Sequence, residues 1–197
     1  MHNNIPAYFL FINSFDEEHI RKLDKKIAII YRNYSIIHDK KIILKIRKTC
    51  KDCGKKFYLS NNLKLAKNLD LDGVYLPSFN TKLNLTHISV KKKFSIIGSA
   101  HSIKEIKIKE KQGVELIFLS PLFKTKKSKK FLNPTRFNYL ASKTNKKVIA
   151  LGGITSQNLN RLKMIKAFGF AGITIFKNID KVRIQNGKWY QGSFKFI

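Results

Sequence analysis

Short apolar runs recur along the chain and alternate with longer stretches in which apolar residues return every three or four positions. The short runs are rich in β-branched and aromatic residues and are apolar throughout, as expected for parallel strands buried on both faces. The longer stretches have the spacing of amphipathic helices, and several end at glycine. The predicted strands are Ala7–Ile12, Ile27–Tyr31, Lys56–Leu59, Gly73–Leu76, Ser95–Ser99, Leu116–Leu119, Lys147–Leu151 and Gly172–Phe176.

Helices are predicted between most of these strands. Ser14 with Glu17, and Ser102 with Glu105, fit the capping box, in which the two side chains satisfy free N–H groups at the start of a helix. The connection 77–94 is irregular, so a helix is not favoured there. The other helical stretches are Ile36–Cys53, Asn62–Leu69, Ser102–Gln112, Thr135–Thr144 and Gln157–Phe168.

Strand and helix alternate without a linker, which predicts one α/β domain, and eight strands favour a (β/α)8 TIM barrel. The end of the chain departs from this pattern, because Val182–Tyr190 reads as two strands around Asn186-Gly187 in place of an eighth helix. We therefore predict a barrel over residues 1–179 and a hairpin appendage over 180–197. The missing helix would expose apolar barrel surface, which the hairpin or a second copy in a homodimer could cover.

Composition narrows the classes of function. No window reaches the roughly 18 uninterrupted apolar residues of a membrane span, and residues 1–6 lack the order of a signal peptide, so we predict a cytoplasmic protein without a membrane partner. The formal charge of +28 would attract polyanions, but the lysines are scattered, which disfavours nucleic acid as the partner. The lone pair Cys50 and Cys53 lacks the further ligands of a zinc site and favours a structural role.

Small and polar residues follow the fifth and seventh predicted strands, where α/β barrels place their ligands. Ser99 and His101 stand two positions apart, so their side chains share a side if the extended conformation continues. A histidine there can exchange protons near neutral pH, and a loop histidine that caps the next helix is an equal alternative. Gly152 and Gly153 would let backbone N–H groups approach a phosphate, although two glycines also fit a tight connection.

A lysine segment, residues 124–130 with the sequence Lys-Thr-Lys-Lys-Ser-Lys-Lys, follows the sixth strand. Hydroxyl and ammonium donors together suit a phosphate ester or a pyrophosphate, whereas a solvated lysine run is the alternative interpretation. Arg32, just past the second strand, adds a fork-shaped donor at the same end of the barrel.

Four motifs, in order and spacing, resemble the thiamine phosphate synthase and thiazole tautomerase family. The similarity runs from about Tyr31 to Ile179. It implies a (β/α)8 barrel that joins a hydroxymethylpyrimidine pyrophosphate to a thiazole phosphate, aided by magnesium, in thiamine biosynthesis. The motifs are Ile97-Gly98-Ser99-Ala100-His101-Ser102, Leu119-Ser120-Pro121-Leu122-Phe123-Lys124-Thr125, Ala150-Leu151-Gly152-Gly153-Ile154-Thr155 and Gly169-Phe170-Ala171-Gly172-Ile173.

The resemblance also implies roles for single residues. Arg32 would contact the pyrophosphate, Ser99 would lie near the leaving group, and His101 falls where the tautomerase branch has its general acid/base. The substrate-binding positions predicted in this way are Asn61, Thr125, Lys127, Ser128, Gly152, Gly153, Phe176 and Lys177.

The sequence departs from the family pattern where the metal ligands are expected. The acidic ligands after the third and fourth strands are replaced by Asn61 and Asn80, and Ser60 and Tyr34 replace other family residues nearby. Asparagine offers only a neutral carbonyl oxygen, so these positions should bind a hard dication much more weakly. We therefore predict no ordinary magnesium site.

Three hypotheses remain open. The first, which we favour, is a divergent thiamine phosphate synthase in which lysines of residues 124–130 take over part of the metal's charge neutralisation. The second is a thiazole tautomerase that uses His101 as acid and base. The third is a non-catalytic protein that binds a phosphorylated ligand or nucleic acid.

Overall fold

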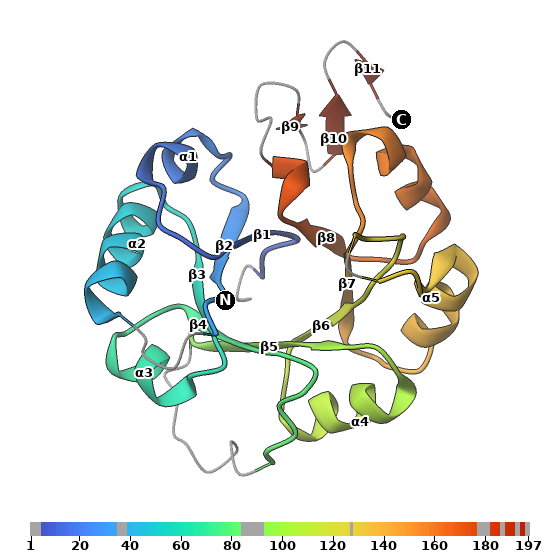
Figure 1. Cartoon of the computed structure of the whole chain (residues 1–197), viewed down its shortest axis with the longest axis horizontal. Coiled ribbons are helices and arrows are strands. Elements are labelled where there is room, and N and C mark those ends of the chain that lie inside the picture. The colour runs from blue at the N-terminus through green and yellow to red at the C-terminus, as the bar shows by residue number, and fades with distance from the viewer. Residues whose placement is uncertain are drawn as a thin grey trace.

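The computed structural model describes residues 5–34, 39–83, 93–126 and 128–176, and the backbone of 182–185, 188–191 and 194–195. Eight parallel strands close into a barrel in sequence order, as β1 pairs with both β2 and β8 (Figure 1). The predicted (β/α)8 fold is therefore confirmed. The strands are β1 (Tyr8–Ile12), β2 (Ile27–Tyr31), β3 (Phe57–Ser60), β4 (Gly73–Leu76), β5 (Ser95–Ala100), β6 (Leu116–Leu119), β7 (Lys147–Leu151) and β8 (Gly169–Gly172).

Helices form a ring outside the barrel (Figure 1). None of the helices in the described part of the chain is long and apolar enough to cross a membrane. Residues 77–83, the described start of the connection between β4 and β5, contain no helix. The helices are α1 (Glu17–Lys22), α2 (Lys40–Asp52), α3 (Leu63–Asn68), α4 (Ile103–Lys111), α5 (Asn133–Ala141) and the 3-10 helices η1 (Ser156–Met164) and η2 (Thr174–Phe176).

A small antiparallel sheet follows η2. It consists of β9 (Val182–Gln185), β10 (Lys188–Gln191) and β11 (Phe194–Lys195), and β9 pairs with β10 as the predicted hairpin requires. The turn at residues 186–187 and the predicted domain boundary near residue 179 lie outside the described residues. The hairpin is thus confirmed in its strand pairing, while the boundary stays a prediction.

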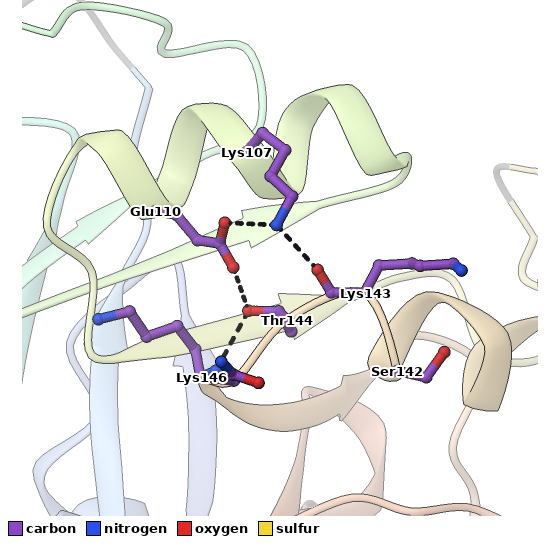
Figure 2. Close-up of a pocket in the computed structure, with 7 residues that line it drawn as sticks. Lys107, Glu110, Ser142, Lys143, Thr144 and Lys146 are labelled. Carbon is purple, nitrogen blue, oxygen red and sulfur yellow. Dashed lines mark hydrogen bonds and ion pairs between the residues drawn. The ribbon is translucent and has the colours of Figure 1, made fainter.

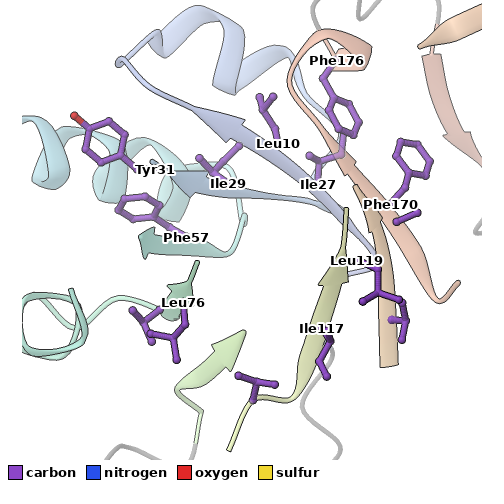
Figure 3. Packing of buried hydrophobic residues seen from close by; sticks show 14 of the residues in the cluster. Leu10, Ile27, Ile29, Tyr31, Phe57, Leu76, Ile117, Leu119, Phe170 and Phe176 are labelled. Atoms are coloured by element: carbon purple, nitrogen blue, oxygen red, sulfur yellow. The ribbon is translucent and has the colours of Figure 1, made fainter. Parts of the chain in front are cut away.

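Alternating side chains along the strands fill two cores. One set lies inside the barrel, where Phe118 makes edge-to-face contacts with Phe9 and Tyr75 at centroid distances of 5.0 and 5.5 Å. The other set packs between the strands and the helices, as the labelled residues of Figure 3 illustrate. Because side chains fill the barrel interior, ligand binding is left to the rim formed by the strand ends.

The eighth strand was predicted too late in the sequence. The β-branched and aromatic run Thr174–Phe176 forms the 3-10 helix η2, and the strand is the glycine-bounded stretch Gly169–Gly172. A Cβ atom on Gly169 would lie 1.8 Å from the carbonyl oxygen of Ala7, so only glycine allows the strand to approach β1 this closely. Barrel closure therefore overrides the low strand propensity of glycine.

The capping predictions were half right. Asp16, and not Ser14, caps α1 by accepting a hydrogen bond from the His19 N–H. Ser102 caps α4 as predicted, because its Oγ accepts from the Glu105 N–H at 3.3 Å. The Glu105 carboxylate, however, accepts from the N–H of His101 at 2.7 Å, one residue earlier than a capping box requires.

Candidate active site

The strand ends bring most of the predicted site residues to one rim of the barrel. Phe176 is an exception, because its buried side chain stacks on Phe170 in the outer core, with ring centroids 5.9 Å apart. Lys127 and Lys177 lie outside the described residues. The predicted residues at or next to the carboxyl ends of the strands are Arg32, Asn61, Asn80, Ser99, His101, Thr125, Ser128, Gly152 and Gly153.

His101 connects the ends of β5 and β6. Its Nδ1 lies 2.6 Å from the carbonyl oxygen of Ser120, which can only accept, so Nδ1 is the donor of this hydrogen bond. Since Ser102 caps α4, the alternative in which the histidine ring caps that helix is wrong. The exposed ring is therefore anchored at one nitrogen and open to a ligand at the other.

Ser99 lies deeper than the rim. It is only 4% exposed, and its hydroxyl is hydrogen-bonded to that of Tyr75 within the barrel. Burial raises the pKa of Tyr75, and the bond to Ser99 acts in the opposite direction. Arg32 and Tyr34 lie close enough to influence this group electrostatically, and the Arg32 guanidinium sits over the ring of Phe11 at 5.2 Å. The Arg32 cation thus lies against the aromatic interior of the barrel.

Gly152 and Gly153 pack closely against the chain that follows β6, and we call this contact the seam. Both have positive φ angles, 92° and 71°, which favour glycine. A Cβ atom on Gly153 would lie 2.6 Å from the carbonyl oxygens of Phe123 and Lys124. The glycine N–H groups donate no hydrogen bond to any other residue in the described part of the chain. The two glycines therefore allow the segments to pack closely, and their N–H groups are available as hydrogen-bond donors to an anion.

The lysine segment beyond this seam is locally ordered. Thr125 and Ser128 pair with each other, because the Ser128 N–H donates to Thr125 Oγ1 at 3.0 Å and the Thr125 N–H donates to the Ser128 carbonyl at 3.2 Å. The hydroxyl of Ser128 also donates to the carbonyl oxygen of Lys130. The described lysines of the segment are exposed, and none forms an ion pair with a described residue. Their charge is available to an incoming anion.

Asn61 and Asn80, at the positions of the family's metal ligands, form a hydrogen-bonded amide pair. Asn80 Nδ2 donates to Asn61 Oδ1 at 2.7 Å, and Asn80 Oδ1 accepts from the Lys82 N–H at 3.1 Å and from Gln112 Nε2 at 3.3 Å. Magnesium needs oxygen ligands with free lone pairs, preferably anionic ones. No group of three or more His, Cys, Asp or Glu side chains in the described ranges could hold a metal. These residues do not fit a magnesium site.

A buried lysine that the sequence analysis missed holds the loop that carries Asn80. Lys109, on α4, is 0% exposed, and its Nζ donates to the carbonyl oxygens of Pro77 and Asn80 at 2.8 and 2.7 Å and to Gln112 Oε1 at 2.9 Å. Its stem passes Gly98, where a Cβ atom would lie 3.0 Å from Lys109 Cδ. Burial lowers the pKa of Lys109 to about 8, so the ammonium form still prevails at neutral pH. An internal cation thus fixes residues 77–82, which we call the β4 loop.

A surface hollow at the opposite end of the barrel is a weaker candidate. It has a volume of about 410 Å³ and lies where the connection between α5 and β7 meets α4 (Figure 2). Its polar groups satisfy one another, since Lys107 Nζ bonds to Glu110 at 2.8 Å and Thr144 Oγ1 donates to the same carboxylate at 2.6 Å. This pairing holds the pKa of Glu110 below its usual range. The hollow therefore has a structural role.

Comparisons with known proteins agree with the barrel fold. Residues 22–176 match the family described as thiamine monophosphate synthase. A putative thiamine-phosphate synthase 2 of Aquifex aeolicus is 28% identical over 160 residues, covering 78% of this chain and 85% of its own. A thiamine-phosphate synthase of Pelotomaculum thermopropionicum is 31% identical over 119 residues, covering 59% and 55%. The solved thiamine phosphate pyrophosphorylase of Pyrococcus furiosus superposes with a TM-score of 0.68 at 18% identity, covering 87% and 86%.

Proposed function

Since this chain belongs to the thiamine monophosphate synthase family, we propose that it forms thiamine phosphate at the described rim with cationic side chains in place of a tightly bound magnesium ion. The similarity to these relatives identifies the chain as a transferase of thiamine biosynthesis, and no comparison favours the hypothesis of a thiazole tautomerase. One observation carries the proposal. The amide oxygens of Asn61 and Asn80 already accept hydrogen bonds, while Arg32 and the lysine segment offer positive charge at the same end of the barrel.

The substrates are the phosphorylated hydroxymethylpyrimidine and thiazole that the family joins. The bond between the pyrimidine methylene and the pyrophosphate breaks when the leaving group is neutralised and the carbocation is kept from water. Arg32 is pre-oriented for this role by the ring of Phe11. The lysine segment adds exposed point charges, and an ammonium group contacts phosphate oxygens without the fixed fork geometry of arginine.

The thiazole phosphate is assigned to the seam between β6 and β7. The N–H groups of Gly152 and Gly153 donate to no other described residue, which leaves two neighbouring backbone donors for the phosphate. Asn158 stabilises this turn, because its Nδ2 donates a hydrogen bond to the carbonyl oxygen of Gly153 at 2.8 Å. The lysine segment and the glycine turn meet directly, so both phosphorylated substrates would share one cationic rim.

The test is product formation with and without magnesium. Purified protein is incubated with both substrates in EDTA or in excess magnesium, and thiamine phosphate is measured. We expect product in both tubes, with less than a ~10-fold difference, and we expect Arg32→Gln to lower turnover in both. Product in the magnesium tube alone would reject the cationic replacement. No product in either tube would reject the synthase.

A further inference from the structure

Two exposed aromatic rings face each other on the rim where the metal ligands were expected. Tyr34, after β2, is 52% exposed, and Phe79, in the β4 loop, is 63% exposed. Their ring centroids are 5.6 Å apart with planes at 68°, an edge-to-face contact. Large apolar rings left open to solvent at the mouth of a barrel mark a surface that an apolar ligand can cover.

The amide pair beside these rings presents N–H donors. The Lys82 N–H can only donate, so it fixes Oδ1 as the inner atom of Asn80 and turns Nδ2 toward Asn61. Asn61 then accepts through Oδ1, and its own Nδ2 has no hydrogen-bond partner among the residues that the structure describes. Asn61 adopts a φ of 59°, which holds this exposed amide at the end of β3. The free groups suit an acceptor such as a ring nitrogen and repel a cation.

An unpaired hydroxyl lies just below the amide pair. Ser60, the last residue of β3, is 1% exposed, and its Oγ lacks a hydrogen-bond partner in the described part of the chain. Ser60 is in register with Tyr75, whose ring lies inside the barrel. A buried hydroxyl without a partner is costly, but this one has almost no exposed surface, so it lies out of reach of a ligand on the rim.

The β4 loop is built rigidly enough to serve as a binding surface. Lys109 and Gln112 hold it from behind: the Lys109 ammonium binds two loop carbonyls, and Gln112 Nε2 donates to the carbonyl oxygens of Asn80 and Lys82 at 3.0 and 2.9 Å. Phe79 lies between these anchored residues. Its ring is therefore positioned before a ligand arrives, which lowers the cost of binding.

We propose that Tyr34, Asn61, Phe79 and Asn80 form a heterocycle shelf, which binds the pyrimidine ring of the substrate. The aromatic rings supply the stacking face, and the amide N–H groups meet the polar edge of the ring. This assignment rests on the proposed function for the identity of the heterocycle. It gives the positions of the family's metal ligands a different role, because amide donors beside aromatic rings recognise a flat heterocycle better than a hydrated dication.

The experiment separates the heterocycle from the anion. Binding of the unphosphorylated hydroxymethylpyrimidine and of inorganic pyrophosphate is measured by calorimetry in EDTA. Phe79→Ala should weaken pyrimidine binding ~10-fold or more, the cost of losing one stacking face, and should change pyrophosphate binding less than twofold. Phe79→Tyr keeps the ring and should stay within ~3-fold of wild type. Tyr139→Ala removes an equally exposed ring (54%) from α5 and should change neither.

Three results would overturn the shelf: no pyrimidine binding by the wild type, pyrimidine binding unchanged in Phe79→Ala, or an equal loss of pyrophosphate binding, which would make the surface an anion site. The assay requires no turnover. A protein that binds pyrimidine through Phe79 but makes no thiamine phosphate would keep the shelf and reject the synthase.

Discussion

The β4 loop and the lysine segment lie on the same rim, and both depend on lysine, but in opposite ways. The β4 loop is held by the fully buried ammonium of Lys109, whose hydrogen bonds end on loop carbonyls. The lysine segment carries its described lysines in solvent and is fixed at its root by the close approach of Gly153. A buried lysine therefore sets geometry, whereas exposed lysines supply charge that salt can screen.

The difference follows from the cost of burying a charge. An ammonium inside a protein is tolerated when its donors are all used, and three acceptors surround Lys109 Nζ at 2.7 to 2.9 Å. The exposed lysines have no such cost, so their number is free to vary without disturbing the fold.

The largest effect is expected at the root of the lysine segment. Gly153→Ala places a Cβ atom 2.6 Å from two backbone oxygens at a φ of 71°, so it should destabilise the fold by about 2–5 kcal/mol. Gly113→Ala is the matched control, because its φ is 74° and nothing lies within 4 Å of the added atom. It should cost only about 1–2 kcal/mol. Urea unfolding measures both, and equal losses would refute the close-packing argument.

Removing the buried ammonium should loosen the β4 loop more than the whole fold. In Lys109→Met, the Pro77 and Asn80 carbonyls lose their donor, while the cost of a buried charge disappears. Hydrogen exchange at the amides of Asn80 and Lys82 should accelerate ~10–100-fold, with global stability changed much less. Lys107→Met, from the exposed side of the same helix, is the control and should leave these amides unchanged. Unaltered exchange in Lys109→Met would show that the loop is held by other contacts.

The same lysine predicts a pH dependence with a defined sign. Burial lowers the pKa of Lys109 to about 8 from an ordinary 10.5, so between these values the unfolded chain binds a proton that the folded chain has lost. The stability of wild type relative to Lys109→Met should therefore rise by roughly 1–3 kcal/mol as the pH increases from 8 to 10.5. Below pH 8 both states are protonated, and the difference should be flat. A difference that stays flat up to pH 10.5 would mean that the folded pKa is not lowered and that the loop carbonyls outweigh burial.

The exposed lysines should give the smallest and most salt-sensitive effect. Replacing both Lys129 and Lys130 by glutamine should raise the KM for the pyrophosphate substrate about 2–5-fold at low salt. Stability should stay within about 0.5 kcal/mol, because both side chains are exposed. Lys143→Gln, at the opposite end of the barrel, should change neither quantity. A KM effect that persists at about 0.5 M salt would point to a fixed contact in place of a screened charge.

Sequence reasoning did well where local patterns and packing agree. Fully apolar runs such as Ile27–Tyr31 and Leu116–Leu119 form strands with the predicted bounds, because both faces of a barrel strand are buried. It failed at Gly169–Gly172, where a contact with β1, 160 residues away in the chain, outweighs local propensity.

The buried lysine left a signal that was available but unused. Ile106 and Lys109 stand three positions apart, so both fall on the inward face of α4, and both are buried. A charged residue at an apolar position of a helix indicates a buried partner, and Gly98 provides the space for its stem. The partner could not be foreseen, because the carbonyls belong to an irregular loop whose path no periodicity describes.

Local patterns were sufficient to place eight apolar strands between amphipathic stretches and small polar residues after several strand ends, because hydrophobic periodicity and strand order are local properties of the chain. The polar atoms that remain available at the rim depend on tertiary contacts. The orientation of the Asn61 and Asn80 amides depends on the N–H of Lys82, on Gln112 and on the ammonium of Lys109, which meet only when the barrel closes. Residue type already disfavoured a metal site here, because asparagine replaces the acidic ligands, and hydrogen bonding decided which amide atoms face the rim.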